Sequence, residues 1–458
     1  MAGVAGLITQ RREEETSRIM AKMSEALLHR GAENVLTFDL SQNVRGIAAV
    51  RLFQDDSVTE NQAEDMLQIL MGHDCDLREE ALGCLEIKAV HKEVVIHRQL
   101  FSMTPLYYGR SGPDIAFASE RKALWSIGIS NPVNLQPGYV LSINENAEWH
   151  LSQSDNYERP AMITDCASED IIRDLAETLR RSFLRVKNRR VGVLFSGGVD
   201  SSLVALLAKQ VCEDVKLYSA SSMAFHDRVA AKTAAEVLDI EMKQVDINSD
   251  IVWDVLPNLL FTIESAGLMD VEIALPFYLA SRRAASEGIP LMISGQGPDE
   301  LFAGYSRHVQ IFRDEGERAL EKQLWSEVSQ THEENIERDD RAISTHGMMS
   351  FFPYLAPKFA TLALSIPASW KITLGAEPER KVLFRELARH LGLPESICSS
   401  PKKATQYSSG SSRILMKSLI QNVNEMQDVT RKKLRFHAQE VLNSVASEIG
   451  LPLKTKSK

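Results

Sequence analysis

The run Phe195–Ser202, with the sequence FSGGVDSS, has the residue types and spacing best suited to chemistry. An apolar segment leads into a Ser-Gly-Gly turn and a helical pattern follows at once, so the turn lies where a strand passes into a helix. Free backbone N–H groups at a helix start bind anions, and glycines let the anion approach the backbone closely. The run therefore predicts a phosphate or pyrophosphate site, to which Ser196, Ser201 and Ser202 add hydroxyl donors.

Asp200 lies in the same run, and its negative charge excludes it as a direct phosphate ligand. It suits Mg²⁺, which binds oxygen ligands and bridges a carboxylate to phosphate oxygens. The simpler alternative is a glycine turn that only joins a strand to a helix, but the complete SGGVDSS run argues against it. A Walker P-loop is excluded because the sequence contains no GxxxxGK[ST] pattern.

The run resembles the SGGxDS loop of the ATP pyrophosphatase family, which cradles the pyrophosphate released when ATP adenylates a substrate. A second run, Ile293–Tyr305 with the sequence ISGQGPDELFAGY, is similar to the SGEGADELFGGY motif of asparagine synthetases. The resemblance implies ATP and Mg²⁺ as cofactors. It also implies nucleotide-binding positions at Leu194, Ser196, Gly197, Gly198, Asp200, Ser201, Ser202, Ala220, Ser294 and Gly295.

Asp299 follows the second glycine turn as Asp200 follows the first. Ligands of open α/β sheets bind at the carboxyl ends of the strands, so we expect Asp299 beside Asp200. Two carboxylates at that edge would hold Mg²⁺ against the triphosphate. A solvated acidic turn is the alternative for Asp299 and Glu300.

The resemblance extends over the rest of the second half of the chain. Pro401–Gly410 looks like the lysine-bearing loop that reaches the α-phosphate in the family. A lysine there would offset charge growing on the transferring phosphorus, so Lys403, or else Lys402, is predicted to be catalytic with Asp200 and Asp299. Solvated lysines are the alternative. Further similar segments are Leu179–Ser182, Tyr218–Ser221 (near adenine in the family), Glu264, Asp270, Pro276–Ala280, Arg338–Arg341 and His346–Gly347.

The first half of the chain is similar to the glutaminase half of asparagine synthetases but lacks its nucleophile. The family begins MCGIxG, and its cysteine thiol attacks glutamine while its own α-amine serves as base. Here Met1–Gly6 reads MAGVAG, with Ala2 in place of the cysteine, and no NGEIYN segment occurs between Glu33 and Gly83. We therefore expect a retained fold without glutaminase activity. The motifs that carry this resemblance are His29–Glu33, Thr104–Tyr108, Phe117–Leu124 and Leu135–Gly138.

A second departure concerns the amine-accepting side of the site. Family members read HGxExR, with the glutamate thought to handle protons, whereas this chain has Met349 at the glutamate position and Phe351 at the arginine position. Ala356 replaces the closing aspartate of PFLD. Methionine and phenylalanine cannot transfer protons, but they can line a pocket for something larger or more apolar than aspartate.

The elements that position these motifs change in character along the chain. Before a polar junction at Leu151–Asp170 the pattern is strand-rich α+β; after it, strands alternate with helices, which implies a parallel sheet. Predicted strands are Gly46–Phe53, Gly83–Val90, Glu93–His97, Ile115–Ala118, Tyr139–Ile143, Arg190–Phe195, Val215–Ala220, Lys243–Ile247 and Pro290–Ile293. Predicted helices are Arg12–His29, Asn61–Met71, Ser201–Val211 and Asp227–Leu238, with mostly helix after Leu301.

This pattern and the resemblance give the predicted fold class and domains. Residues 168–458 are expected to form an α/β synthetase domain with a parallel-sheet ATP pyrophosphatase fold, like the adenine nucleotide alpha hydrolases. Residues 1–160 are expected to form an α+β domain like the Ntn hydrolases, as a degenerate class II glutamine amidotransferase.

Composition bounds the remaining possibilities. The 458 residues carry 52 Lys and Arg against 62 Asp and Glu, a net charge of −10, which argues against nonspecific nucleic-acid binding. Five cysteines, widely spaced and without a CxxC pair, favour neither a disulfide framework nor a thiolate metal site. No window has 18 consecutive apolar residues, and no secretory signal is seen. We expect a cytoplasmic protein without nucleic-acid or membrane partners. A homo-oligomer is compatible with these observations.

The resemblance implies an ATP-dependent, AMP-forming ligase that joins a small-molecule carboxylate to ammonia or another amine. Two alternatives stay open. One is intramolecular amide formation of the β-lactam synthetase type, whose members also carry a disabled glutaminase half. The other is a nucleotide-binding regulatory protein that has lost turnover. A tRNA-thiolating enzyme is disfavoured, because paired catalytic cysteines and a basic tRNA surface are both missing from the sequence.

Overall fold

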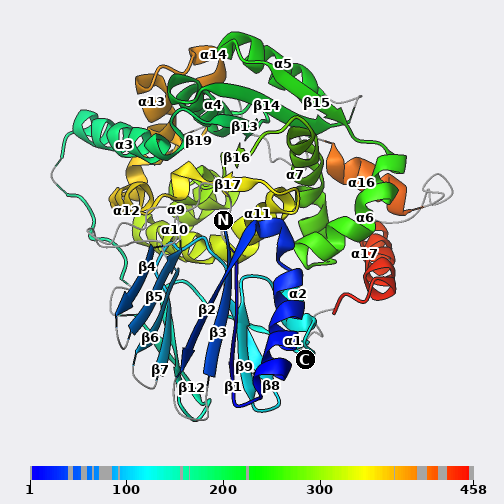
Figure 1. Cartoon of the computed structure of the whole chain (residues 1–458). Helices are drawn as coiled ribbons and strands as arrows, with labels where there is room; N and C mark the ends of the chain where they lie inside the picture. The colour runs from blue at the N-terminus through cyan, green and yellow to red at the C-terminus, as the bar shows by residue number, and fades with distance from the viewer. Residues whose placement is uncertain are drawn as a thin grey trace. The chain divides into compact units, whose positions relative to one another are not determined.

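In the computed structural model, the chain forms two compact units (Figure 1). Unit 1 comprises Met1–Pro160, His332–Glu337 and Ala356–Ala360; unit 2 comprises Ala161–Thr331, Arg338–Leu355 and Thr361–Lys458. The structure describes all residues except 1–2, 40–44, 53–58, 64–65, 72–84, 91–92, 155–157, 165, 223–225, 376, 400–409, 421–430 and 453–458.

Unit 1 contains two antiparallel sheets of six strands each. The first has the order β10 (Val133–Asn134), β8 (Tyr107–Ser111), β9 (Asp114–Ala118), β1 (Gly3–Thr9), β3 (Arg45–Leu52), β2 (Ala32–Asp39). The second has the order β12 (Trp149–Gln153), β11 (Tyr139–Asn144), β7 (Glu93–Arg98), β6 (Leu85–Val90), β5 (Met66–Met71), β4 (Thr59–Ala63).

Alternation along β1 explains how these sheets are layered. Val4 and Ile8 point into a core shared with Ile96 of the second sheet. The intervening Leu7 points the other way and packs in a cluster with Met23 of α1 (Glu13–Glu25), which also contains residues of α2 (Arg121–Trp125). Residues of one strand point alternately to its two faces, so the sheets pack face to face and the helices cover the outer face of the first.

The helix predicted at Asn61–Met71 is wrong, because this segment contributes to two strands. β4 pairs with β5, and β5 pairs with β6 from Met66↔Val90 to Met71↔Leu85. Pairing with a neighbouring strand overrides the local helical spacing of the apolar residues. The other strands predicted in this half are found within one or two residues of their expected ends, among the described residues.

Unit 2 is built on a five-stranded parallel sheet, which confirms the predicted parallel α/β architecture. Its order is β15 (Met242–Asp246), β14 (Asp214–Ser221), β13 (Arg190–Leu194), β16 (Leu291–Ile293), β17 (Met349–Phe351). All four pairs are parallel. The sequence did not predict β17, which has three residues and lies in a largely helical stretch.

Helices fill the crossovers and the remainder of unit 2. Between the strands lie α4 (Val199–Val211), α5 (His226–Leu238), α6 (Ser249–Ile263) and α7 (Leu268–Ser286), with α3 (Ser168–Phe183) before the sheet. After β16 come α8 (Pro298–Leu301), α9 (Ser306–Glu315), α10 (Glu317–Thr331) and α11 (Glu337–Ser344), which begins in unit 1. The last helices are α12 (Pro357–Ser365), whose first four residues belong to unit 1, α13 (Val382–His390), α14 (Glu395–Cys398), α16 (Ser411–Leu419) and α17 (Arg431–Glu448).

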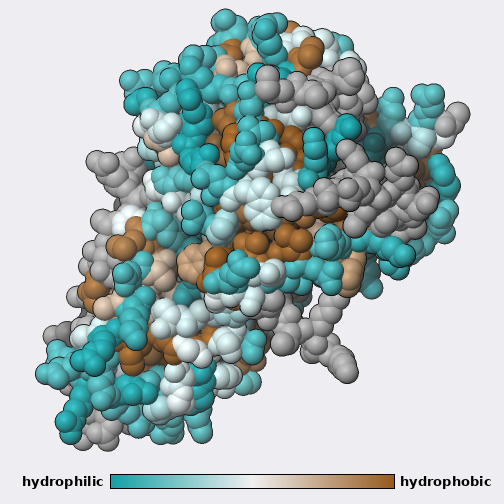
Figure 2. Space-filling view, turned by 90° about the vertical axis from the view of Figure 1, so that its right-hand side faces the viewer, coloured by the Kyte–Doolittle hydropathy of each residue, from teal (hydrophilic) through white to brown (hydrophobic). Residues whose placement is uncertain are grey.

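The surface carries scattered apolar side chains among polar ones. On the side shown in Figure 2, hydrophilic residues surround smaller patches of hydrophobic ones. Among the helices that the structure describes, none is both long enough and apolar enough to cross a membrane.

Candidate active site

The first glycine turn follows the central strand of the parallel sheet. β13 ends at Leu194, and the N–H of Phe195 donates to the carbonyl of Tyr218 in the neighbouring strand over 2.9 Å. Gly197 then adopts φ +76°, and a Cβ on it would lie 2.6 Å from the Cα of Ala231 in α5. Both the backbone conformation and the packing against α5 therefore require glycine at this position.

Gly198 differs from Gly197 in both respects. Its φ is −79°, which any residue adopts, and a Cβ there would only touch the Ser196 hydroxyl at 3.6 Å. Gly198 is the N-cap of α4, and no side chain caps this helix. The Cβ that is missing here leaves space beside an uncapped helix start, an arrangement that accommodates an anion.

Serine hydroxyls surround this turn. The Ser201 hydroxyl lies 3.1 Å from that of Ser196 and 3.3 Å from the Ser196 N–H. The Ser202 hydroxyl is fully buried and has no hydrogen-bond partner in the described part of the chain. An orphaned buried hydroxyl is uncommon, and a bound phosphate oxygen is one partner that would satisfy it.

The second glycine turn is in contact with the first. β16 ends at Ile293, and the N–H of Ser294 donates to the carbonyl of Phe351 over 2.9 Å. A Cβ on Gly295 would lie 3.0 Å from both the carbonyl carbon of Asp200 and the amide nitrogen of Ser201. The two motifs therefore meet backbone to backbone at the carboxyl edge of the sheet.

Asp200 and Asp299 converge on a third residue, Lys381. Its ammonium nitrogen lies 2.8 and 2.7 Å from the two carboxylate oxygens of Asp200 and 2.8 Å from an oxygen of Asp299. The lysine side chain is 2% exposed, whereas the two carboxylates remain partly accessible at 26% and 19%. The structure thus places the two acidic residues together, on a cation that the sequence did not identify.

The backbone around Lys381 is held in place on both sides. The short hairpin β18 (Ile372–Thr373) and β19 (Glu379–Arg380) leads into it, and Lys381 itself adopts the left-handed conformation with φ 59° at the start of α13. The following N–H, of Val382, donates to the carbonyl of Lys371 over 3.0 Å. A strained backbone conformation at a buried charged residue is typical of functional sites.

Gly304 allows this close approach. A Cβ at this position would lie 1.9 Å from Oδ1 of Asp299 and 2.4 Å from Cε of Lys381. The Gly304 carbonyl also accepts a 3.0 Å hydrogen bond from Arg380, which fixes the hairpin beside it. The glycine is therefore required by the ion pair rather than by its own backbone angles.

Burial and charge shift the protonation of the surrounding groups. Burial alone would lower the pKa of Lys381, but the carboxylates of Asp200 and Asp299 outweigh it and raise that pKa, so the lysine is charged. Burial, and after it the charge of Asp299, raises the pKa of Glu300 to about 7. The Tyr305 hydroxyl donates to Glu300 over 2.5 Å.

The site has the ligands for a phosphate-bound divalent cation, but not for a cation held by protein alone. Two carboxylates already converge on one positive charge, and hard cations such as Mg²⁺ prefer oxygen ligands of this kind. Among the described residues, no group of three or more His, Cys, Asp and Glu side chains gathers closely enough to hold a metal. Mg²⁺ is usually bound by one or two carboxylates together with water and substrate phosphates, and these two carboxylates suit that kind of site.

A polar network from α11 lies beside the second glycine turn. Gln296 donates to the carboxylate of Asp339 over 2.9 Å, and Arg338 donates to the same carboxylate over 2.9 Å. Asp339 is fully buried, and burial raises its pKa despite the neighbouring Arg338. Arg338 also faces Asp270 at 3.9 Å. This is the segment whose sequence resembles the family's RDxxxxxHG region.

The apolar run in β17 lies in the interior of unit 2. Met349 and Phe351 are 3% and 4% exposed, and the Phe351 ring packs edge to face on Phe183 of α3 at 5.8 Å. Ser350, between them, hydrogen bonds to Asp340. Phe351 therefore belongs to the core against α3. Phe352, 3% exposed, follows at the carboxyl end of the strand.

The remaining predicted residues fall into two groups. Ala220 lies near the carboxyl end of β14. All the described nucleotide-binding candidates therefore lie at or just after the carboxyl ends of three adjacent strands, β14, β13 and β16. Lys402 and Lys403 lie outside the described residues, as do Ala2, Cys75 and Cys84. Lys381 was not predicted from the sequence. Its one signal there is a lysine directly before an amphipathic helix, which is a common arrangement without special chemistry.

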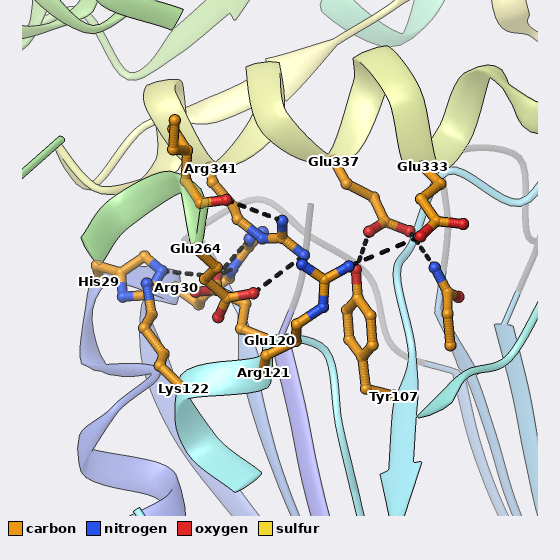
Figure 3. Close-up of polar contacts among 12 residues, drawn as sticks. His29, Arg30, Tyr107, Glu120, Arg121, Lys122, Glu264, Glu333, Glu337 and Arg341 are labelled. Atoms are coloured by element: carbon orange, nitrogen blue, oxygen red, sulfur yellow. Dashed lines mark hydrogen bonds and ion pairs between the residues drawn. The ribbon is translucent and has the colours of Figure 1, made fainter. Parts of the chain in front are cut away.

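Charged residues also gather inside unit 1, where the retained motifs meet. Glu120 accepts from His29 at 2.8 Å and from Arg30 at 2.5 Å, and Lys122 lies 2.5 Å from it (Figure 3). Burial raises the pKa of Glu120, but its contacts with Arg30 foremost, and with His29 and Lys122, lower it well below its usual value. The motifs beginning at His29 and Phe117 are thus joined by one buried carboxylate.

Comparison with known proteins shows the family of the chain. Residues 174–318 and 309–449, together more than half of the chain, match the family described as asparagine synthase. The chain belongs to the asparagine synthetase family. Membership of the asparagine synthetase family implies an ATP-dependent ligase that acts on small molecules.

Several asparagine synthetase relatives are similar over most of the chain. One, from Methanocaldococcus jannaschii, carries the name of a glutamine-hydrolyzing asparagine synthetase; it is 30% identical, with 75% of this chain and 73% of the relative covered. The glutamine-hydrolyzing asparagine synthetase of Mus musculus is 25% identical over 82% of this chain and 69% of its own length. The chain spans half the length of asparagine synthetase 2 of Arabidopsis thaliana, at 25% identity over 61% of this chain.

Among solved structures, NMN synthetase from Francisella tularensis is similar at 14% identity and a TM-score of 0.27. The match covers 64% of this chain and 99% of that one.

Proposed function

We propose that this member of the asparagine synthetase family is an AMP-forming amide ligase without glutaminase activity. The observation that carries the proposal is the convergence of Asp200 and Asp299 on one cation, directly beside the uncapped glycine turn of α4. An anion site and two metal-binding carboxylates in contact with one another match the needs of a Mg²⁺-bound triphosphate.

The proposed reaction has two steps. An oxygen of the substrate carboxylate attacks the α-phosphorus of ATP, the bond to the bridging oxygen breaks, and pyrophosphate leaves with that oxygen. An amine nitrogen then attacks the activated carbonyl carbon, AMP departs with the electron pair of the acyl–oxygen bond, and the nitrogen loses a proton. When bound, Mg²⁺ neutralises negative charge on the phosphate oxygens.

Residues of unit 2 take up distinct roles in this scheme. The turn from Ser196 to Gly198 and the first N–H groups of α4 bind pyrophosphate, while Asp200 and Asp299 hold the metal. Lys381 supplies a positive charge at the same edge of the sheet, suited to stabilise charge that grows on the phosphorus. Lys403, predicted for that role from the sequence, remains a candidate for a second cation in the same place.

We propose that residues 168–458 form the synthetase domain and residues 1–160 a glutaminase-like domain of the Ntn type. Ala2 supplies neither a thiol nor any other nucleophile, so the nitrogen would come from free ammonia or from an amine of the substrate. A chain that makes the amide with ammonium but not with glutamine would support this assignment. Glutamine-dependent activity would contradict it.

Met349 supports a second candidate within the same chemistry. It is buried where the family has a glutamate thought to handle protons, and methionine cannot take over that role. An intramolecular ligase of the β-lactam synthetase type would act on one substrate that bears both carboxylate and amine. A strict requirement for such a substrate would favour this candidate over ammonia ligation.

The test is the formation of AMP and pyrophosphate from Mg·ATP with a panel of carboxylic acids. An acid-dependent exchange of pyrophosphate into ATP that is lost in Asp200→Asn is the expected result. Ser306→Ala, at an exposed helix start in unit 2, is a matched control that should retain exchange. Failure to bind ATP, or binding without AMP formation for any acid, would contradict ligase activity; the latter would favour a regulatory nucleotide-binding protein.

A further inference from the structure

Lys381 and a divalent cation need the same two carboxylates. The lysine nitrogen lies within 2.8 Å of three oxygens, two from Asp200 and one from Asp299. These two side chains are the ones to which the proposed function assigns Mg²⁺. No third acidic, histidine or cysteine side chain completes a metal site with them in the part of the chain that the structure describes.

The two cations exclude each other at this position. Mg²⁺ binds oxygen at about 2.1 Å, so an ion held by both carboxylates would stand where the ammonium now stands. Moving the ammonium only slightly would leave a single and a double positive charge a few ångströms apart in a site of low dielectric, where they repel strongly. Two carboxylates carry enough negative charge for one of these cations but not for both.

We propose that Lys381 is the resident counter-ion of the metal site and makes metal binding depend on nucleotide. Without nucleotide, the lysine keeps Asp200 and Asp299 paired. When the phosphates bring further negative charge, the carboxylates exchange the ammonium for the divalent cation, and the ammonium moves onto the phosphates. The proposal rests on the proposed function, because the triphosphate supplies the charge that both cations need.

The surroundings of Lys381 suit a movement of the side chain alone. Its backbone is fixed by the hydrogen bond from Val382 to Lys371 and by the left-handed turn before α13. The lysine side chain has four rotatable bonds, and its Cε lies against Gly304, where no side chain obstructs it. Asp200, its closest partner, lies in the first turn of α4, so the phosphates would arrive at the same end of the side chain.

The experiment measures the binding of Mn²⁺, as a paramagnetic stand-in for Mg²⁺, by electron paramagnetic resonance of the free ion. Full-length wild type, Lys381→Met and Lys371→Met are titrated with and without a nonhydrolysable ATP analogue. Lys371 is the matched control: it is also buried and precedes the same hairpin, but its nitrogen donates to the carbonyl of Ala363 over 2.7 Å.

Without nucleotide, we expect Lys381→Met to bind Mn²⁺ at least about tenfold more tightly than wild type and Lys371→Met, because the competing charge is gone. With nucleotide, wild type should bind Mn²⁺ tightly. Thermal unfolding gives a second readout: Lys381→Met removes the ammonium that separates the two carboxylates, so its melting temperature should fall and Mg²⁺ alone should raise it again. Mg²⁺ alone should not change that of wild type.

Equally tight Mn²⁺ binding by wild type and Lys381→Met without nucleotide would overturn the proposal. So would tight binding by Asp200→Asn/Lys381→Met, since the ion would then lie elsewhere. If Lys381→Met does not fold, the wild type still decides the question: tight binding of Mn²⁺ by wild type without nucleotide would contradict the proposal. The proposed function is judged separately: a wild type that forms AMP yet binds Mn²⁺ without nucleotide keeps its function and loses the counter-ion role.

Discussion

The hydroxyl of Tyr354 donates a 2.9 Å hydrogen bond to the main-chain carbonyl of Asp200. Tyr354 lies in the short 3₁₀ helix Pro353–Leu355 directly after β17, is fully buried, and packs its ring edge to face on Phe384 of α13 at 5.4 Å. One tyrosine thus connects the edge strand, the first turn of α4 and the helix that begins after Lys381. It is a positioning residue for the proposed metal ligand.

Tyr354→Phe should retain the ring packing and lose this one hydrogen bond. We expect a loss of about 1 kcal/mol in the free energy of unfolding, the usual net value of a hydrogen bond. If the bond positions Asp200, the kcat of AMP formation should fall about fivefold, while the KM for the carboxylic acid changes little. Urea unfolding and steady-state kinetics measure these two quantities. A loss of stability with unchanged kcat would contradict a positioning role.

Substitutions at the two glycines of the first turn should affect different properties, stability at Gly197 and ligand binding at Gly198. Gly197→Ala should destabilise unit 2 by about 2 kcal/mol or more, because φ +76° is unfavourable for alanine and its Cβ would collide with Ala231. Gly198→Ala should leave stability almost unchanged, since its angles are ordinary and its Cβ meets only Ser196 at 3.6 Å.

The diagnostic measurement for this pair is ATP affinity, by calorimetric titration of the folded Gly198→Ala protein. Its new methyl group would occupy space beside the uncapped start of α4, so we expect ATP affinity to drop at least about tenfold. Unchanged affinity in Gly198→Ala would mean that the phosphates do not approach this turn.

Gly304→Ala tests the tight packing around the ion pair. A methyl group at 1.9 Å from Asp299 and 2.4 Å from Lys381 must push the two charges apart. We expect loss of AMP formation by at least about a hundredfold and destabilisation of about 2 to 3 kcal/mol. Gly375→Ala is the control, because nothing lies within 4 Å of its Cβ position and it should behave like wild type. Equal rates of AMP formation by Gly304→Ala and Gly375→Ala would contradict the need for Asp299 and Lys381 to pack closely against Gly304.

The sequence predicted the parallel sheet well because its signals are local. Apolar runs of strand length, each followed by a glycine turn and a helical pattern, identified β13, α4 and β16 within a few residues. The three residues of β17 form a strand because they pair with β16, and their own composition does not distinguish them from the neighbouring segments. The same reason explains the error at β4 and β5, whose strand identity comes from their partners.

The sequence predicted two of the three members of the ion cluster. Asp200 and Asp299 follow glycine turns after strands, and the rule for parallel sheets brings such positions to one edge. Lys381 reaches the same point from a separate hairpin more than 80 residues after Asp299, so its place depends on the tertiary fold alone. Likewise, the inward orientation of Phe351 toward α3 depends on packing that a motif comparison does not contain.

His346 should make stability depend on pH below neutrality. Its Nε2–H donates to the carbonyl of Tyr278 over 3.1 Å, and burial lowers its pKa to about 4, although that hydrogen bond acts in the opposite direction. Between pH 4 and the ordinary value of 6.5, the unfolded chain binds the proton and the folded chain does not. The free energy of unfolding therefore falls as the pH is lowered through this range, by up to about 3 kcal/mol from this residue.

The measurement for His346 compares urea unfolding of wild type and His346→Gln at pH 7.5, 6 and 4.5. The variant cannot titrate, so its stability should fall less steeply with decreasing pH than that of wild type. Parallel pH curves for the two proteins would contradict a lowered pKa of His346 in the folded state.

Glu337 should be essential to the interior of unit 1. It lies 3.3 Å from the buried guanidinium of Arg98 and accepts a hydrogen bond from Tyr107 (Figure 3 shows Glu337 and Tyr107). Both charged side chains are at most 1% exposed. Glu337→Gln would remove the carboxylate that lies nearest to the buried arginine charge, so we expect a loss of about 3 kcal/mol in the free energy of unfolding.

Two further variants decide whether this loss comes from the unpaired charge. Glu334→Gln, three residues earlier on an exposed position, should change stability by less than about 0.5 kcal/mol. Arg98→Met combined with Glu337→Gln removes both charges and should be less destabilised than Glu337→Gln alone, because the remaining guanidinium bears most of the cost of the single change. The single variant Arg98→Met completes the comparison. If the loss in the free energy of unfolding of the double variant equals the sum of the losses of Arg98→Met and Glu337→Gln, the two residues contribute independently. The buried ion pair would then not be what stabilises this part of unit 1.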